Sequence, residues 1–372
     1  MRVPGLLIVA ACWLAAAAAA RAAEPLGQPA GLVREAITVP FGPKALTLEA
    51  VVTRPAGAGK FPLIVLSHGT PRNAEDRAKT HANMYSAVAV AFARRGWAVV
   101  EVVRRGYGHS AGEYAESSGQ CGHRDYVKAG RTSAEDVLAT VKAMERQPAV
   151  DATRIMLVGI SAGGFASIAA AAQQPPGLRA VLNFAGGRGS DAPDSVCDAD
   201  KLVAAYGVFG KTVRVPTLWL YAENDHFFGP KLARRFFAAF KEAGSTGEFV
   251  ALPAIGEDGH LLLSDEAVPL WRDRVDAFLR QQKLPTWNKP IEEKPAALRP
   301  PAGLSAHARE DFERYLATGH FEKTFAVGAK THGYGWASGR RTPEDAARDA
   351  LDACAKHARD CRLYAINERL AR

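Results

Sequence analysis

The sequence predicts an α/β fold, a mostly parallel sheet with helices on both faces, followed by a small α+β domain. Three observations predict it. Short apolar runs of strand length alternate with longer helical segments from residue 34 to residue 282. Of the 372 residues, 48% are hydrophobic and 23% charged, as is typical of globular domains. A proline-rich stretch then separates residues 303–372, which carry strand and helix patterns of their own.

The first part of the chain predicts alternating strands and helices. Because parallel strands end at a common edge, the loops after these strands should face one cleft. Strands are expected at 34–39, 46–52, 61–67, 98–103, 155–158, 178–184, 216–222 and 248–252. Helices are expected at 82–93, at 133–146 with Ser133 as its cap, and at 165–172, 230–243 and 268–279. Residues 106–130 and 185–210 are expected to be irregular.

A serine lies at the turn between the strand 155–158 and the Ala-rich helix 165–172. Gly159 and Gly163 flank Ser161, so the turn can close tightly and the helix can approach the strand. This arrangement exposes a serine hydroxyl at the top of a sheet, beside a helix N-terminus that favours negative charge. The alternative is a glycine-rich turn without chemistry.

A second Gly-x-Ser-x-Gly pattern surrounds Ser110. The residues after it, 113–120, are polar and lack helical periodicity. A nucleophile turn needs a helix directly behind it, so Ser161 is the preferred nucleophile.

A serine nucleophile needs a base, and the base needs an acid that fixes its tautomer. Asp225 and His260 follow two later strands, in the order serine, acid, histidine that this layout requires. Asp225 could instead cap a turn, and His260 could be an ordinary loop histidine. The rival acid is Glu223, and the rival bases are His226, His109 and His123.

The predicted oxyanion hole uses two backbone N–H groups. One belongs to Ala162, which follows the nucleophile, and the other to Thr70, in the His68-Gly69 turn after the third strand. Pro71 has no N–H and cannot serve.

Residues 34–282 resemble an α/β-hydrolase. The resemblance lies in five pieces: Ser67-His68-Gly69, residues 105–112, Gly159-Ile160-Ser161-Ala162-Gly163, residues 221–225 and Asp258-Gly259-His260. Within the superfamily the chain is most similar to the dienelactone-hydrolase-like and serine-peptidase-like branches. True dienelactone hydrolases carry a cysteine nucleophile, whereas Ser161 stands there in this chain, so the resemblance implies ester hydrolysis without fixing a dienelactone as the substrate.

The resemblance implies a serine hydrolase that forms an acyl-enzyme on Ser161 and acts on a small ester, with no cofactor or metal. The alternatives are a serine peptidase acting on short peptides and a non-enzymatic binding protein on a hydrolase scaffold. Neither a nucleic-acid motif nor a later membrane-spanning stretch is expected, and the oligomeric state stays open.

Four regions are expected along the chain. Residues 1–22 read as a signal peptide, 24–283 as the hydrolase domain, 284–302 as a Pro-rich linker and 303–372 as a small α+β domain. A lipoprotein cleavage box at residues 9–12 is the weaker alternative. The signal predicts export to the periplasm or the medium, where disulfides persist.

The mature chain would hold four cysteines, which allow three pairings. The pairing that keeps each bond within one domain is Cys121 with Cys197 and Cys354 with Cys361. The tail also resembles small Trp-Ala-Ser-Gly and paired-Cys domains of exported bacterial proteins. Its Tyr334 and Trp336 are interpreted as core, with a binding patch as the alternative.

The net charge of +8 is mild, and its basic residues are spread along the sequence. A solvated basic surface is the preferred interpretation. Arg104 and Arg105 lie near the expected cleft. We interpret them as arginines in surface ion pairs with acidic side chains, and binding of an anionic substrate is the alternative.

Overall fold

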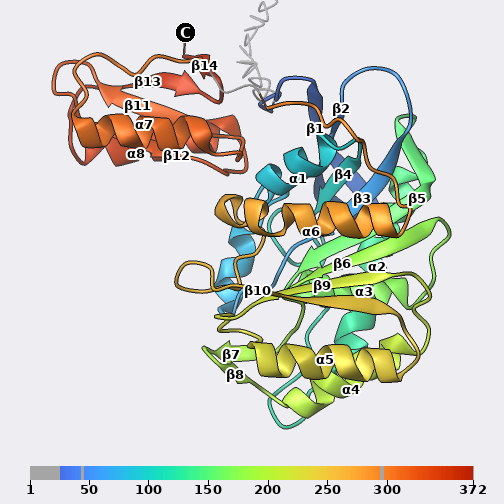
Figure 1. Cartoon of the computed structure of the whole chain (residues 1–372). Coiled ribbons are helices and arrows are strands. Elements are labelled where there is room, and N and C mark those ends of the chain that lie inside the picture. The colour runs from blue at the N-terminus through green and yellow to red at the C-terminus, as the bar shows by residue number, and fades with distance from the viewer. Residues whose placement is uncertain (1–25, 43–45, 294–296, 372) are drawn as a thin grey trace, which may run out of the picture.

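The computed structural model describes residues 26–42, 46–293 and 297–371. The predicted signal peptide, 1–22, lies outside the described residues. A larger unit built on a central sheet is followed by a smaller unit at its side (Figure 1). Both parts of the predicted fold class are confirmed.

The large sheet has eight strands in the order β1-β2-β4-β3-β5-β6-β9-β10. Strand β2 pairs antiparallel with both β1 and β4, and every other neighbouring pair is parallel. The strands are β1 (Leu32–Phe41), β2 (Leu46–Pro55), β3 (Phe61–Ser67), β4 (Ala98–Val102), β5 (Val150–Ile160), β6 (Leu178–Phe184), β9 (Thr217–Ala222) and β10 (Gly247–Leu252). The parallel strands are almost continuously apolar because helices cover both of their faces.

The helices form two layers (Figure 1). On one face, α1 (Ser86–Ala93) meets α6 (Val268–Gln281) through stacked Phe92 and Trp271. On the other lie α2 (Tyr126–Met144), α3 (Ala162–Ala171), α4 (Ala199–Gly210) and α5 (Pro230–Glu242). In that layer Tyr206 of α4 contacts both Phe165 and Phe236, so three helices share one aromatic core. Short 3-10 helices η1 (Ala74–Lys79) and η2 (Asp265–Ala267) precede α1 and α6.

Two sequence expectations were wrong. Helix α2 begins at Tyr126, not at Ser133, because the Asp125 side chain caps it by accepting the N–H of Lys128. Ser133 lies inside the helix and donates its hydroxyl proton to the carbonyl of Ala129. The segment 185–210 is not irregular throughout: it forms a hairpin of β7 (Ser190–Ala192) and β8 (Ser195–Val196), and then α4.

The smaller unit has a four-stranded sheet and two helices. Its sheet order is β12-β11-β13-β14, with all neighbours antiparallel. The elements are α7 (Ala306–Ala317), β11 (Thr324–Gly328), β12 (Tyr334–Ala337), α8 (Pro343–Ala355), β13 (Cys361–Ile366) and β14 (Arg369–Leu370). Tyr334 stacks on Phe325 and Trp336 contacts Tyr315, so both side chains pack on the small core.

The smaller unit docks on the larger one through buried polar contacts. Arg34 of β1 forms an ion pair of 2.7 Å with Glu322, and both side chains are fully buried. Asn83 donates its amide to the carbonyl of Arg340 at 2.7 Å. Between the units, the backbone N–H groups of Trp287 and Ile291 donate to the two carbonyls that follow α1, those of residues 95 and 94. The described part of residues 284–302 contains no helix or strand.

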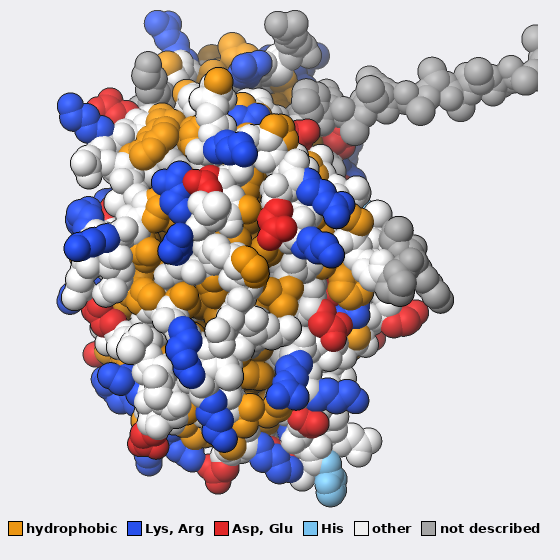
Figure 2. All heavy atoms as spheres, turned by 90° about the vertical axis from the view of Figure 1, so that its right-hand side faces the viewer, with side chains coloured by type: hydrophobic (Ala, Val, Ile, Leu, Met, Phe, Trp, Pro, Cys, Tyr) orange, Lys and Arg blue, Asp and Glu red, His pale blue; other side chains and the backbone are white. Residues whose placement is uncertain are grey.

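The charge on the surface is mixed. Figure 2 shows Lys and Arg side chains spread over one face among Asp and Glu, without a large patch of a single sign. No helix in the described part of the chain is both long and apolar enough to cross a bilayer.

Candidate active site

Ser161 occupies a strained turn between β5 and α3. Its backbone has φ 56° and ψ −126°, a conformation that a side-chain-bearing residue rarely adopts. The turn is held by its own N–H, which donates to the carbonyl of Phe184, and by its carbonyl, which accepts from Gly187. Strain stored at one serine between a strand and a helix is the backbone feature of a nucleophile turn.

The glycines beside Ser161 let α3 approach the sheet. A Cβ on Gly163 would lie 2.1 Å from the carbonyl oxygen of Ser67, and one on Gly159 would lie 2.3 Å from the backbone of Gly163. Only glycine fits at either position. This close packing places Ser161 beside the loop that follows β3.

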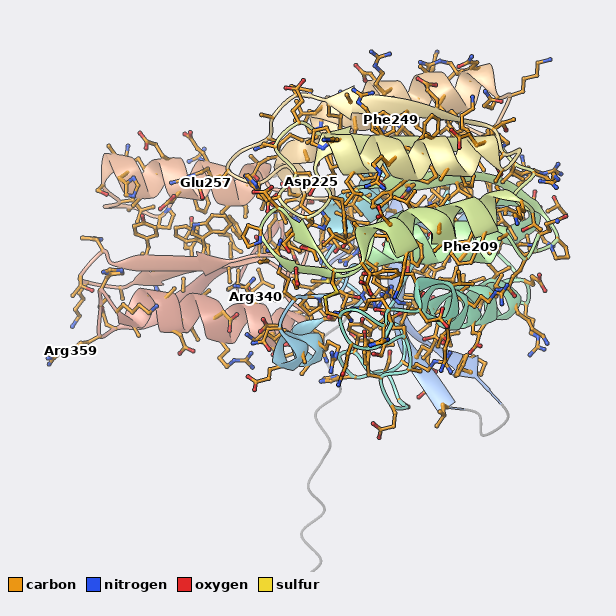
Figure 3. All side chains as sticks on the ribbon, turned by 90° about the horizontal axis from the view of Figure 1, so that it is seen from below. Phe209, Asp225, Phe249, Glu257, Arg340 and Arg359 are labelled. Atoms are coloured by element: carbon orange, nitrogen blue, oxygen red, sulfur yellow. A yellow bond between two sulfur atoms is a disulfide. The ribbon has the colours of Figure 1, made fainter. Side chains whose placement is uncertain are left out.

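Asp225 and His260 meet at the same end of the sheet. The Nδ1 atom of His260 lies 3.2 Å from both carboxylate oxygens of Asp225, which is 2% exposed. Asp225 follows β9 and His260 follows β10, and these strands are parallel neighbours. Figure 3 shows Asp225 near Glu257, at the edge of the larger unit that faces the smaller one.

Ser161 and His260 line one cavity of about 480 Å³, here called the apolar cavity. The ring of Phe227 stacks on His260 with centroids 3.9 Å apart, and this contact fixes the plane of the imidazole. Met84, Tyr85, Ile160 and Leu263 contribute to the wall. His320 of the smaller unit also lines it, so the docked C-terminal unit helps to shape the cavity.

The two predicted oxyanion donors lie beside Ser161. Thr70 and Ala162 line a second cavity together with Ser161. An ideal Cβ at Gly69, just before Thr70, would lie 3.6 Å from the hydroxyl oxygen of Ser161, so the β3 loop reaches the serine. Within the described part of the chain, the N–H groups of Thr70 and Ala162 donate to no protein acceptor.

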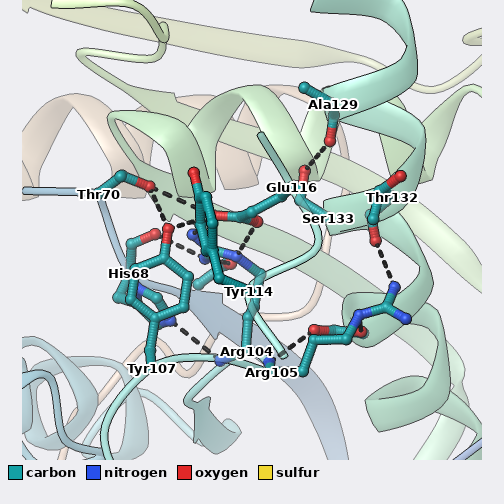
Figure 4. Close-up of polar contacts among 12 residues, drawn as sticks. His68, Thr70, Arg104, Arg105, Tyr107, Tyr114, Glu116, Ala129, Thr132 and Ser133 are labelled. Atoms are coloured by element: carbon teal, nitrogen blue, oxygen red, sulfur yellow. Dashed lines mark hydrogen bonds and ion pairs between the residues drawn. The ribbon is translucent and has the colours of Figure 1, made fainter. Parts of the chain in front are cut away.

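A buried polar network holds the β3 loop, and sequence analysis did not anticipate it (Figure 4). His68 lies 2.6 Å from the carbonyl of Gly69 through Nδ1, and its Nε2 accepts the N–H of Arg104. Burial, with the neighbouring Arg104 charge, lowers the pKa of His68 to about 3, so the ring is neutral. A neutral ring with Nδ1 protonated donates to Gly69 and fixes the turn that carries Thr70.

Glu116 is the anionic centre of that network. It binds Arg104 at 2.8 Å and accepts hydrogen bonds from the hydroxyls of Tyr107 and Thr70 (Figure 4). The guanidinium groups of Arg104 and Arg188 hold the pKa of Glu116 far below its ordinary value, against the opposing effect of burial. The expectation that both arginines form surface ion pairs is wrong for Arg104, which is fully buried and pairs with Glu116. Arg105 pairs with the exposed Glu135 and with Asp136.

The rival residues lie in other environments. The Ser110 hydroxyl donates to the carbonyl of Val103 and accepts the N–H of Glu49, so it ties two strands together. His226 binds the exposed Asp194. Exposed side chains are found at Glu223, His109 and His123.

Both expected disulfides are present, Cys121–Cys197 and Cys354–Cys361. The first joins the loop after β4 to the segment after β6, across a sequence separation of 76 residues. Among the described residues there is no group of three or more His, Cys, Asp or Glu side chains suited to a metal ion.

Comparison with known proteins gives a family match and structural neighbours. The model of the X-Pro dipeptidyl-peptidase (S15 family) matches residues 44–198. No curated protein matches the sequence. Acylaminoacyl peptidase of Pyrococcus horikoshii is similar with a TM-score of 0.50 and 17% identity, over 70% of this chain and 43% of that one.

Two smaller enzymes are also similar. A Klebsiella pneumoniae protein assigned as a dienelactone hydrolase has a TM-score of 0.49 and 16% identity, over 67% of this chain and 99% of its own. An esterase of Pyrococcus furiosus has a TM-score of 0.46 and 15% identity, over 67% of this chain and 93% of its own. From the sheet order, the turn at Ser161 and the Pyrococcus horikoshii neighbour together, we conclude that the larger unit has the α/β-hydrolase fold.

Proposed function

We propose that this protein is an exported serine hydrolase that cleaves carboxylic esters through an acyl-enzyme on Ser161. The observation that carries the proposal is the Asp225–His260 hydrogen bond at the rim of a cavity that Ser161 also lines. A serine in a strained turn, a histidine and a buried carboxylate are the parts that acyl transfer needs.

The proposed reaction has two steps. His260 takes the proton of the Ser161 hydroxyl as its oxygen attacks the substrate carbonyl, and the N–H groups of Thr70 and Ala162 stabilise the oxyanion. His260 then gives that proton to the leaving alcohol, and the acyl group stays on Ser161. Water, deprotonated by His260, attacks the acyl-enzyme and releases the acid, and Ser161 regains its proton.

Asp225 has a positioning role. Its carboxylate accepts from Nδ1 of His260, which leaves Nε2 as the basic nitrogen for Ser161. It also stabilises the imidazolium that forms in each step.

A peptidase acting on short peptides is the second candidate, because the S15 family model covers residues 44–198. The chemistry of acyl transfer is the same for an amide, and only the leaving group differs. Export is supported by the two disulfides, which persist in oxidising compartments.

Hydrolysis of 4-nitrophenyl butyrate by purified protein tests the proposal. Ser161→Ala should lower kcat by about 10³-fold or more, because the nucleophile is removed. Ser110→Ala is the matched control: it removes a hydroxyl that only bridges backbone groups, and the activity should remain. Retention of activity in Ser161→Ala would refute the assignment, and a parallel panel of short peptide amides separates esterase from peptidase.

A further inference from the structure

A second cavity adjoins Ser161, with a volume of about 150 Å³, and we call it the arginine cavity. Its wall includes four arginines from three separate segments of the chain: Arg72, Arg77, Arg124 and Arg188. No Asp or Glu is among its described lining residues. We propose that this cavity binds a carboxylate group of the substrate, an inference that rests on the proposed esterase function.

Arg188 is the buried element of the cavity. It is only 6% exposed, and its Nη1 donates to the carbonyl of Glu116 at 2.9 Å. Its Nη2 pairs with the carboxylate of Glu116 at 3.0 Å, whereas its Nε is buried without a hydrogen-bond partner among the described residues. A buried guanidinium with an unused donor is costly unless a further acceptor, such as a carboxylate oxygen, completes its hydrogen bonds.

The charges around Arg188 do not balance. Arg104 and Arg188 are both buried and both pair with the single carboxylate of Glu116. Two cations and one anion leave a surplus of positive charge beside the nucleophile. An incoming carboxylate would remove that surplus.

The other three arginines add to this charge, and none forms an ion pair with a described carboxylate. Arg77 lies over the ring of Tyr114 at 4.0 Å, and Arg72 lies over Phe227 at 3.5 Å. Arg124 donates to Ser118, and its buried Nε has no partner in the described ranges of the chain. Asp198 pairs with Lys201 and accepts the backbone N–H of Arg124, so it forms no ion pair with the Arg124 guanidinium.

The disulfide Cys121–Cys197 holds the two walls of the cavity together. One wall comes from residues 114–124 and the other from residues 187–190. The backbone N–H of Cys197 donates to Gly189 at 3.0 Å, so the bond fixes the second wall directly. A cavity of 150 Å³ exceeds the ~30 Å³ share of one water several-fold, and so admits a carboxylate.

Each of the two cavities would hold a different part of the substrate. They share Thr70, Pro71, Ser161 and Phe227, and they differ in character: one is mainly apolar and the other is cationic. We therefore infer a half-ester substrate, apolar on one side of the scissile carbonyl and anionic on the other.

Two matched pairs of esters test this. For an anion in the acyl group, mono-4-nitrophenyl glutarate is compared with 4-nitrophenyl butyrate; for an anion in the leaving group, 4-carboxyphenyl butyrate is compared with 4-carbamoylphenyl butyrate. For each ester, the background rate of hydrolysis measured with the Ser161→Ala variant is subtracted from the rate of the wild-type protein. Wild-type protein should favour one anionic ester by about tenfold or more in kcat/KM, as expected for a charge-assisted contact.

Arginine variants assign the preference to the cavity. Arg77→Gln and Arg124→Gln should each lower the ratio of anionic to neutral kcat/KM several-fold, and added NaCl should lower it in wild type. The matched control is Arg235→Gln, which removes an exposed arginine that pairs with Asp200 and should leave rates and ratio unchanged.

The outcomes separate the two proposals. Hydrolysis of the neutral esters without preference in either pair would overturn the arginine cavity as a subsite and leave the esterase assignment standing. If no ester were cleaved in a Ser161-dependent way, the function would fail, and calorimetry with glutarate would decide the subsite. Binding weakened by Arg77→Gln would support it, and absence of binding to wild type would overturn it.

Discussion

The carboxylate of Asp225 lies 3.2 Å from Nδ1 of His260 across a sequence separation of 35 residues. Oδ1 of the same carboxylate accepts the backbone N–H groups of Phe227 at 2.7 Å and Phe228 at 2.9 Å. The loop after β9 therefore holds the carboxylate in place and directs it at the imidazole. Under the proposed mechanism this contact selects the tautomer in which Nε2 can act as base.

Asp225→Asn should lower kcat for 4-nitrophenyl butyrate by about 10³- to 10⁴-fold, with a smaller effect on KM. The asparagine carbonyl oxygen can still accept the N–H groups of Phe227 and Phe228, so the loop should keep its shape. The amide NH₂ would then face Nδ1 and favour the wrong tautomer of His260. Steady-state kinetics and a far-UV circular dichroism spectrum, the latter unchanged, check this.

The matched control is Asp194→Asn. Asp194 also binds a histidine, His226, but this pair is exposed. The kcat of the Asp194→Asn variant should stay within about twofold of the wild-type value, because ion pairs at the surface contribute little to stability. Equal effects of the two substitutions, or more than a tenth of wild-type kcat in Asp225→Asn, would contradict the positioning role of Asp225.

Sequence analysis predicted the parallel strands well because their apolar runs are short and end in glycine or polar turns. Residues 178–184 coincide with β6, and the strand before Ser161 is longer than expected at both ends, from Val150 to Ile160. Each of Ser161, Asp225 and His260 follows the carboxyl end of a different predicted strand. Once the strands are parallel, these three residues must share one edge of the sheet.

The elements that sequence analysis missed depend on tertiary contacts. The start of α2 at Tyr126 is fixed by Asp125 and by a hydroxyl bond from Tyr126 to the carbonyl of Cys197, and this second partner is distant in sequence. The arginine cavity was missed for the same reason. Its residues 72, 77, 124 and 188 have no common spacing, and only the fold brings them together.

Removal of the Cys121–Cys197 disulfide should destabilise the protein and weaken the arginine cavity. The chain-entropy model gives a loss of about 4.5 kcal/mol for the Cys121→Ser/Cys197→Ser variant, and about 2.5 kcal/mol for Cys354→Ser/Cys361→Ser. Urea unfolding of both variants measures the two losses. The first variant should also reduce the preference for an anionic ester, whereas the second, with its bond in the smaller unit, should not. An unchanged preference in the first variant would mean that the disulfide does not shape the cavity.

Stability should depend on pH through Glu101 in β4. Burial raises the pKa of Glu101 from 4.5 to about 8, so the folded protein keeps a proton that the unfolded chain loses above pH 4.5. This contribution to stability is present below pH 4.5 and is lost as the pH rises to about 8. Glu101→Gln keeps an oxygen for the N–H of Tyr85 and does not titrate.

The unfolding free energy of Glu101→Gln minus that of wild type should therefore rise with pH. The expected slope is about 1.4 kcal/mol per pH unit between the two pKa values, flattening near pH 8. Urea titrations at closely spaced pH values measure the difference, in which the other ionisable groups largely cancel. Parallel pH profiles for the two proteins would show that Glu101 is ionised in the folded state.

The last prediction concerns the ion pair that joins the two units. Arg34 and Glu322 are fully buried, and Glu322 also accepts the backbone N–H of Gly27. Arg34→Met would leave the carboxylate buried without its cation, at a cost of about 3–5 kcal/mol. Arg34→Met/Glu322→Gln removes both charges and should recover part of that loss, whereas Arg348→Met, at an exposed pair with Asp345, should change stability by less than about 0.5 kcal/mol.

Loosening this junction should also affect the apolar cavity. His320 lines that cavity and lies two residues before Glu322, so a displaced smaller unit would open one wall. At temperatures where Arg34→Met remains folded, KM for 4-nitrophenyl butyrate should therefore rise, while kcat, set by residues of the larger unit, should change less. A variant with reduced stability but unchanged KM would show that the smaller unit stabilises the fold without shaping the substrate cavity.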